Sequence, residues 1–289
     1  MNEIIRIAAV NDISGFGKCS LTVALPVISA TGVECCCLPT ALLSTHTGGF
    51  TGYTFTDLSD ELLPIARHWR EVGVSFDGIY SGYLASASQA ELLKETVSIL
   101  RTEKTRLIVD PVMADNGAYY SNFGDEMCRA FKGLCHAADV ITPNITEAAF
   151  MTGLPYADGP HSEEYIGSLL AGLGEICRGI IVLTGVRPDE GSIGAVAYDP
   201  KTSEKHLAVK PICEGPFHGT GDLFASAFSA LFLRGAGLKA ATETAIMLVS
   251  ESIDRTVRRG TPRRNGVDFE GALPKYILEV AKLFGEDSL

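Results

Sequence analysis

Short apolar segments alternate with segments of helical periodicity along this chain, and this alternation restricts its possible folds more than any other feature. Strands are predicted where apolar or β-branched residues predominate, at residues 4–10, 33–38, 78–84, 106–112, 138–144, 180–185, 193–198 and 206–209. Helices are predicted at residues 18–30, 58–72, 88–103, 223–232, 238–258 and 269–284. Strands that alternate with helices predict an α/β fold, with a mostly parallel sheet and helices on both of its faces.

The composition and charge set limits on the class of protein. With 289 residues, of which 46% are hydrophobic, the chain can bury a sizeable core in one large domain or two small ones. The formal net charge of −11 argues against nucleic-acid binding, which needs a basic face. One basic cluster lies near the end of the chain and comprises Arg255, Arg258, Arg259, Arg263 and Arg264. A solvated helix end is the simpler interpretation of this cluster, and a local anionic ligand is the alternative.

The eight cysteines are not arranged as a zinc site, because none shows paired Cys-x-x-Cys spacing. Cys35, Cys36 and Cys37 continue an apolar run and are predicted to lie in a buried strand. No signal-peptide pattern precedes them, so we expect free thiols in a reducing cytoplasm. No apolar run approaches the roughly 20 residues that a membrane-spanning helix needs.

The segment Gly219-Thr220-Gly221-Asp222 immediately precedes the predicted buried helix at residues 223–232. Its two glycines allow the backbone to turn tightly and to approach a ligand closely. The free N–H groups and the dipole of a helix start favour an anion such as phosphate. Asp222 would place a carboxylate at the same point, so the segment indicates phosphoryl transfer to a hydroxyl that Asp222 orients and deprotonates. The alternative is that Asp222 only caps the helix.

Further polar residues follow predicted strands or lie in the loops beyond them, namely Asp12, Thr47, Asp110, Asn144, Glu147 and Thr184. The ends of parallel strands form one edge of a sheet, where open α/β folds bind ligands, so this common position favours a shared site. Asp110 and Glu147 could face Mg2+ there. Structural alternatives exist, since Asp12 and Asp110 are turn formers and Asn144 with Glu147 has capping-box spacing. Tyr83 could stack on a flat ring or only pack.

Two other nucleotide-binding motifs do not match. Gly17-Lys18 resembles part of a P-loop, but Asp12 stands where that motif needs Gly, and Cys19 stands where it needs Ser or Thr. No Gly-x-Gly-x-x-Gly follows the first predicted strand, which argues against a dinucleotide-dependent dehydrogenase. His46, without evident partners, is interpreted as a hydrogen-bonded structural residue rather than as a metal ligand.

Four motifs together resemble the ribokinase-like superfamily, and most closely its pyridoxal kinase branch: Ser81-Gly82-Tyr83-Leu84, Asp110-Pro111-Val112-Met113, Ile141-Thr142-Pro143-Asn144 with Glu147, and Gly219-Thr220-Gly221-Asp222. The likeness extends over about residues 4–235. It implies one kinase domain over residues 1–289, folded as a ribokinase-like three-layer α/β/α sandwich. It also implies ATP-dependent phosphorylation of the 5'-hydroxymethyl group of pyridoxal, pyridoxine or pyridoxamine, by a homodimer. From the cysteines, the charge and the apolar runs, we expect a cytoplasmic protein that binds neither nucleic acid nor membrane.

On the nucleotide side, the resemblance assigns the role of catalytic base to Asp222. The loop that binds the transferring phosphate would consist of Gly219, Thr220 and Gly221. Asn144 and Thr184 match positions that contact the nucleotide phosphates. ATP is therefore an expected cofactor.

The resemblance likewise assigns a metal site and an acceptor pocket. Asp110 and Glu147 match positions that hold Mg2+, largely through water, while dependence on a monovalent cation such as K+ stays open. Asp12 matches a contact to the polar edge of the vitamer ring, and Thr47 and Tyr83 match residues that line the vitamer pocket. We therefore expect Asp222 to face the same pocket as these three residues.

Departures from the pyridoxal kinase pattern leave an alternative substrate open. Asp12 stands where many pyridoxal kinases have Ser and where hydroxymethylpyrimidine kinases usually have Asp. His218 before the phosphate loop is also similar to the pyrimidine kinases, and Ala114 replaces a family Gly. The alternative enzyme is a hydroxymethylpyrimidine (phosphomethylpyrimidine) kinase of thiamin synthesis, or a kinase of dual specificity. A regulator that binds nucleotide or vitamer without turnover is a third hypothesis, against which Asp222 argues.

Overall fold

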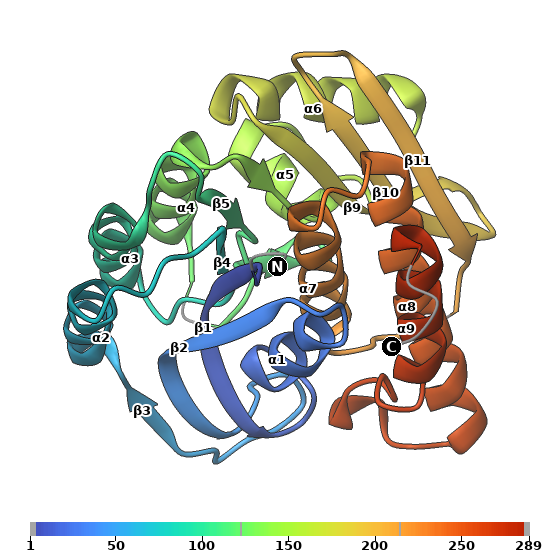
Figure 1. Cartoon of the computed structure of the whole chain (residues 1–289). Helices are drawn as coiled ribbons and strands as arrows, with labels where there is room; N and C mark the ends of the chain where they lie inside the picture. Colours follow the sequence, from blue (N-terminus) through green and yellow to red (C-terminus); the bar gives the residue numbers. More distant parts are fainter. Residues whose placement is uncertain (1–3, 122, 214, 286–289) are drawn as a thin grey trace.

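The main sheet has nine strands within the residues that the computed structural model describes, which are 4–121, 123–213 and 215–285 (Figure 1). Their spatial order is β11 (Glu204–Pro211), β10 (Ser192–Asp199), β9 (Ile180–Asp189), β8 (Val140–Ile141), β5 (Arg106–Val109), β4 (Gly78–Ser81), β1 (Arg6–Phe16), β2 (Glu34–Thr45) and β3 (Phe55–Asp57). The strands from β9 to β2 in this order are parallel, and β3, β10 and β11 are antiparallel to their neighbours. The predicted mostly parallel sheet is confirmed.

Two hydrophobic cores lie on opposite faces of this sheet. One is covered by α2 (Ser59–Glu71), α3 (Ala87–Leu100), α4 (Asp125–Ala137), α5 (Ile145–Thr152) and α6 (Glu163–Ile176). The other is covered by α1 (Leu21–Ser29), α7 (Thr220–Leu233), α8 (Leu238–Arg259) and α9 (Leu273–Phe284). Along β1, Ala8 contributes to the first core and Ile7 and Ala9 to the second, because successive strand residues face opposite sides. The three-layer α/β/α arrangement is thus confirmed.

Two predicted loops are partly strand. In the predicted loop at residues 11–17, β1 continues as far as Phe16. In the predicted loop at residues 44–50, β2 continues as far as Thr45. These extensions pair with each other in parallel, as in Ser14 with Leu43, after a register shift between Asn11 and Ile13. The backbone hydrogen bonds of this ladder outweigh the turn preference of the Asn, Asp, Ser and Gly residues.

Two helices, α4 and α6, were not predicted as separate elements. The signal was present in α4, where Met127, Phe131 and Leu134 are buried at helical spacing. The predicted loop at residues 117–123 contains half of a small hairpin, formed by β6 (Ala114–Asp115) and β7 (Ala118–Tyr119).

The cysteines and the length of the helices were also predicted from the sequence. All eight cysteines are free thiols, as expected. Of the helices in the described ranges, none combines the length and apolar character that crossing a bilayer requires.

Candidate active site

The turn before α7 has a backbone that only glycine adopts without strain. Gly219 has a φ of 78°, and a Cβ atom at this position would lie 1.9 Å from the carbonyl oxygen of Lys18. A Cβ on Gly221 would meet no atom within 4 Å, so the space beside this glycine is open. The Thr220 hydroxyl donates to the carbonyl oxygen of Phe217 at 3.2 Å. The N–H groups in the first turn of α7 have no partners within the helix. The open space beside Gly221 leaves room for a ligand at this turn.

Asp222 lies in this first turn, as the third residue of α7, and is half-buried. Its carboxylate accepts a hydrogen bond from the backbone N–H of Ser20 and lies 3.5 Å from the side-chain nitrogen of Asn11. Burial, with a contribution from the charge of Asp12, raises the pKa of Asp222 to about 6, while the Ser20 and Asn11 donors oppose this shift. A carboxylate with this pKa is mostly ionised at neutral pH and can still accept a proton.

Asn11 and Ser20 connect the predicted residues and were missed from the sequence. The fully buried Asn11 accepts hydrogen bonds from the backbone N–H groups of Asp12 (3.0 Å) and Tyr83 (2.8 Å), and its amide nitrogen faces Asp222. Ser20 has a φ of 58°, a strained value for a non-glycine residue, and this backbone directs its N–H to Asp222 and its hydroxyl to Asp12. The only sequence signal was their place beside Asp12 and at the start of α1.

Asp12 is buried, with 3% of its surface exposed. One carboxylate oxygen accepts the hydroxyl of Ser14 at 2.9 Å and the other accepts the hydroxyl of Ser20. Burial raises the pKa of Asp12, and the two hydroxyl donors oppose the shift. Asp12 therefore lies close to Asp222, as expected, but its carboxylate is already engaged by two serine side chains.

Tyr83 lies just after β4, the strand that pairs with β1, which carries Asp12. Its half-buried ring is 5.7 Å from that of Phe123, and burial, Asp12 and Tyr53 raise the pKa of its hydroxyl to about 12. Together with the link through Asn11, this charge effect shows that Tyr83, Asp12 and Asp222 share one neighbourhood. These three residues therefore lie near one another, while a pocket that they share with Thr47 stays a prediction.

Thr47 is exposed and lies on the loop that follows β2. His46 holds this loop, because its Nδ1 accepts from the N–H of Gly48 (3.1 Å) and its Nε2 donates to the carbonyl oxygen of Arg264 (2.7 Å). The ring of His46 is 5.1 Å from that of His218, which directly precedes Gly219. The loop that carries Thr47 is thus next to the phosphate loop, and His46 has the structural role that was expected.

A row of buried carboxylates continues from Asp222 toward α5. Burial and the charge of Asp222 raise the pKa of Asp110 to about 8, although the Thr142 hydroxyl donates to Asp110 at 3.0 Å. Burial and the charge of Asp110 raise the pKa of Glu147 well above its ordinary value. Neighbouring buried carboxylates that affect each other's ionisation in this way fit the oxygen-rich surroundings that Mg2+ prefers. No group of three or more His, Cys, Asp or Glu residues in the described ranges could ligate a metal directly.

Asn144 and Glu147 have the capping-box geometry that was the structural alternative for them. Asn144 Oδ1 accepts from the N–H of Glu147, and Glu147 accepts from the N–H of Asn144, both at 2.9 Å. Glu147 also accepts the N–H of Met113 at 3.0 Å, and the Asn144 amide donates to the carbonyl oxygen of Ala114 at 2.8 Å. Thr184 pairs with Asn144 in a parallel bridge, which places it beside the start of α5. Asn144, Thr184 and Glu147 are therefore brought together.

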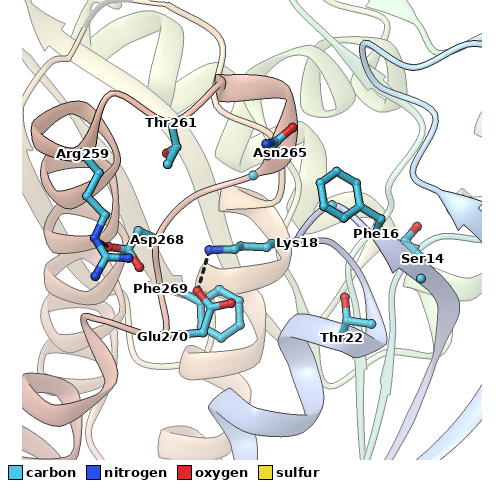
Figure 2. A pocket seen from close by; sticks show the side chains of 13 residues that line it. Ser14, Phe16, Lys18, Thr22, Arg259, Thr261, Asn265, Asp268, Phe269 and Glu270 are labelled. Carbon is cyan, nitrogen blue, oxygen red and sulfur yellow. Dashed lines mark hydrogen bonds and ion pairs between the residues drawn. The ribbon is translucent and has the colours of Figure 1, made fainter.

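A cavity of about 360 Å³ lies between the end of β1 and the segment after α8, and Lys18 is one of the residues that line it (Figure 2). Figure 2 shows Lys18 reaching across it to Glu270, with Arg259 and Asp268 on one wall. None of the predicted site residues lines this cavity. The carbonyl oxygen of Lys18 also lies against Gly219, so one short segment borders both the cavity and the phosphate loop.

Comparison with known proteins gives consistent matches over nearly the whole chain. A family model described as phosphomethylpyrimidine kinase matches residues 23–266. A Bacteroides thetaiotaomicron protein, provisionally described as a phosphomethylpyrimidine kinase and crystallised with pyridoxal, is 33% identical, with a TM-score of 0.89 over 95% of this chain and 96% of that one. The pyridoxal kinase structure from Lactobacillus plantarum is 29% identical, with a TM-score of 0.87 over 97% and 99% of the two chains. The pyridoxine/pyridoxal/pyridoxamine kinase of Bordetella pertussis is 27% identical over 266 residues, 85% of this chain and 87% of that protein.

Proposed function

This chain belongs to the phosphomethylpyrimidine kinase family, and from that premise we propose that it transfers the γ-phosphate of ATP to the 5'-hydroxymethyl group of vitamin B6 vitamers. The acceptors would be pyridoxal, pyridoxine and pyridoxamine, because similar full-length relatives are named as kinases of these compounds. The product from pyridoxal would be pyridoxal 5'-phosphate, so the reaction would serve vitamer salvage.

The observation that carries this proposal is the position of Asp222. Its carboxylate lies in the first turn of α7, directly after a glycine turn with open space beside Gly221, and next to Asp12 and Tyr83. A phosphate held at a helix start and a base beside it are the two elements that transfer to an alcohol needs. We assign Gly219, Thr220 and Gly221 to the transferring phosphate, and Asn144 and Thr184 to the remaining nucleotide phosphates.

In the proposed reaction, Asp222 orients the acceptor hydroxyl and accepts its proton. The hydroxyl oxygen forms a bond to the γ-phosphorus, the bond from this phosphorus to the bridging oxygen breaks, and ADP leaves with that electron pair. The amides of the phosphate loop would stabilise charge on the equatorial oxygens. Thr47 and Tyr83 would hold the vitamer, and Asp12 would face the polar edge of its ring.

Mg2+ would neutralise phosphate charge when it is bound. Asp110 and Glu147 fit this cation, because their buried carboxylates offer the oxygen atoms that Mg2+ prefers, and the charge of Asp110 raises the pKa of Glu147. Since Thr142 and three backbone N–H groups already occupy much of these carboxylates, we propose that water molecules lie between them and the ion. Whether the reaction requires a monovalent cation such as K+ can be tested by adding or omitting that cation in the kinase assay described below.

Phosphorylation of hydroxymethylpyrimidine is the second candidate function. The description of the matched family favours it, and so does Asp12, whose carboxylate stands where pyridoxal kinases often carry Ser. The presence of a vitamer in the similar Bacteroides structure favours the B6 vitamers. The two acceptors share the hydroxymethyl group, so Asp222 would serve both.

The test is a side-by-side assay of the purified protein with ATP, Mg2+ and each of pyridoxal, pyridoxine, pyridoxamine and hydroxymethylpyrimidine. We expect kcat/KM to be at least about tenfold higher with one of the vitamers than with the pyrimidine. A preference for the pyrimidine would replace the first candidate with the second. Binding of a vitamer without any consumption of ATP would instead favour a regulator.

We further propose that the protein acts as a homodimer in the cytoplasm. Sedimentation velocity at several concentrations measures the mass in solution directly. A species of about twice 30.8 kDa is expected, and a monomer at all concentrations would contradict the proposal.

A further inference from the structure

Residues 261–270, here called the C-terminal strap, contact three separate segments of the candidate site. The strap contains a short 3-10 turn, η1 (Arg263–Asn265), that follows α8. Two consecutive arginines of this turn each lie over an aromatic ring from a different loop. The sequence interpretation of this basic cluster as a solvated helix end does not account for these contacts.

The first contact reaches the acceptor loop at residues 46–50. The exposed guanidinium of Arg264 lies 5.4 Å from the centre of the Phe50 ring. The carbonyl oxygen of the same residue accepts the hydrogen bond from His46 Nε2 at 2.7 Å. Arg264 therefore holds both ends of the loop that carries Thr47.

The second contact reaches the phosphate loop. The guanidinium of Arg263 lies 4.7 Å from the centre of the Phe217 ring. The carbonyl oxygen of Phe217 accepts the hydroxyl of Thr220, the first residue of α7. Arg263 is thus connected, through one aromatic residue, to the turn that would hold the transferring phosphate.

The third contact reaches the segment under Gly219. The N–H of Lys18 donates to the carbonyl oxygen of Asn265 at 3.2 Å, and Lys18 Nζ lies 2.6 Å from a carboxylate oxygen of Glu270, as Figure 2 shows. Gly266 has a φ of 85°, and a Cβ on it would lie 2.7 Å from Lys18 Cβ, so the strap and this segment are in close contact.

The strap is anchored on α8. Asp268 is 4% exposed, and its Oδ2 lies 3.3 Å from Arg255 Nε and 3.2 Å from Arg259 Nε. Its N–H donates to the Thr256 hydroxyl at 2.7 Å. A buried carboxylate between two guanidiniums fixes the strap to the helix better than exposed ion pairs would.

We propose that the C-terminal strap positions the two substrate loops, with Arg264 as a positioning residue for the acceptor loop and Arg263 as one for the phosphate loop. Each guanidinium restricts its loop through an aromatic face and therefore reduces the ordering that substrate binding would otherwise require. The inference rests on the proposed kinase function for its kinetic consequences, but the order of the loops does not depend on turnover.

The kinetic test compares Arg264→Ala and Arg263→Ala with the unchanged protein. We expect Arg264→Ala to raise the KM for the vitamer by about 3- to 10-fold with the KM for ATP changed less than about 2-fold, and Arg263→Ala to give the reverse pattern. Arg264→Lys should restore most of the vitamer KM because it keeps a cation over Phe50. Arg258→Ala is the matched control, since the polar contacts of that exposed residue with the described part of the chain are with Glu251 and Asp254 of its own helix.

Hydrogen exchange measured without substrates separates this inference from the proposed function. Arg264→Ala should speed exchange at residues 46–50, and Arg263→Ala at residues 215–221, while both variants keep the urea midpoint of the Arg258→Ala control. An equal rise in both KM values for each variant, or unchanged exchange in both loops, would overturn the strap proposal. Ordered loops together with no phosphorylation of any acceptor would contradict the proposed function alone.

Discussion

At the scale of single residues, the central feature is a set of carboxylates whose ionisation the fold makes costly. Burial and the charge of Asp12 raise the pKa of Asp222. Hydrogen bonding from the Ser20 N–H and the Asn11 amide lowers it. The balance leaves a base that is ionised near neutral pH, with a pKa of about 6. Asp110 and Glu147 have hydrogen-bond donors too, but burial, together with the charge of Asp222 on Asp110 and the charge of Asp110 on Glu147, outweighs them and raises both pKa values.

Removing the Asp222 carboxylate is expected to affect turnover more than nucleotide binding. Asp222→Ala should lower kcat by about 100-fold or more, because the hydroxyl loses its proton acceptor, with little change in the dissociation constant of ATP. Steady-state kinetics and calorimetric titration measure the two quantities. Unchanged turnover would remove Asp222 from the role of base.

The pH dependence gives an independent check on the same residue. Because a base must be ionised, kcat/KM should fall below a pH of about 6, and this acid limb should be missing from the residual activity of Asp222→Asn. The pKa in the folded protein lies above the unfolded value, so ionised Asp222 reduces stability as pH rises from about 4 through 6. Asp222→Asn should therefore have the higher Tm at pH 7.5 and a similar Tm at pH 4. A lower Tm at pH 7.5 would contradict this electrostatic account.

Magnesium binding is expected to relieve the repulsion between Asp110 and Glu147. Mg2+ should raise the Tm of the unchanged protein and have a smaller effect on Asp110→Asn, which should already be more stable than the unchanged protein without the metal. Differential scanning fluorimetry with Mg2+ and, as a control for ionic strength, with Na+ measures both effects. If Mg2+ raised the Tm of both proteins equally, Asp110 would not contribute to Mg2+ binding.

At the scale of elements, the site depends on how the first turn of α7 meets the end of β1. Gly219 lies against the Lys18 carbonyl, and Ser20, just before α1, bonds to both Asp12 and Asp222. Two chain segments that are distant in sequence, residues 12–20 and 219–222, therefore meet at one junction. The strap residues around η1 contact the same junction at Lys18.

Adding one methyl group should distinguish the two glycines of the phosphate loop. Gly219→Ala is expected to lower the free energy of unfolding by about 1–3 kcal/mol and to abolish most activity, because its φ is positive and its Cβ would overlap Lys18. Gly221→Ala is the control for stability, since its Cβ would meet nothing within 4 Å. Urea unfolding of both variants measures the difference. Equal stability of the two would show that the Lys18 segment moves freely away from position 219.

At the scale of the whole molecule, the two cores lie on one sheet, and their residues alternate along much of the sequence. The first contains residues between Ala8 and Val196, and the second contains residues between Ile7 and Val280. β1 contributes to both, so neither core can be assembled without the sheet that supports the other. This interleaving supports the prediction of one domain over residues 1–289.

A single cooperative unfolding transition should follow from the shared sheet. Trp69, the only tryptophan of the chain, packs against the first core, so its fluorescence reports on α2 and that side, whereas far-UV circular dichroism reports on all helices. The two urea transitions are expected to coincide within error. Separate midpoints would indicate two independently unfolding units.

Much of the architecture was predictable because local pattern and tertiary structure agree in it. The apolar run at residues 106–112 contains the parallel strand β5 at Arg106–Val109, and the helix predicted at residues 223–232 is observed at Thr220–Leu233, so Asp222 lies inside it. The extensions of β1 and β2 were not predictable, because Ser14 and Gly15 have turn preferences that only pairing between distant strands overcomes. Asn11 and Ser20 were missed for the same reason, since their partners Tyr83 and Asp222 are far away in sequence.

The sequence by itself therefore determined the layered α/β fold and the glycine turn with its carboxylate, since both depend on local periodicity and on the conformational freedom of glycine. Only the tertiary structure decided which groups surround that carboxylate. The pKa of Asp222, the repulsion along Asp110 and Glu147, and the contacts of Arg263 and Arg264 all depend on burial and on distances between remote segments. These distances exist only once the sheet has brought its strand ends together.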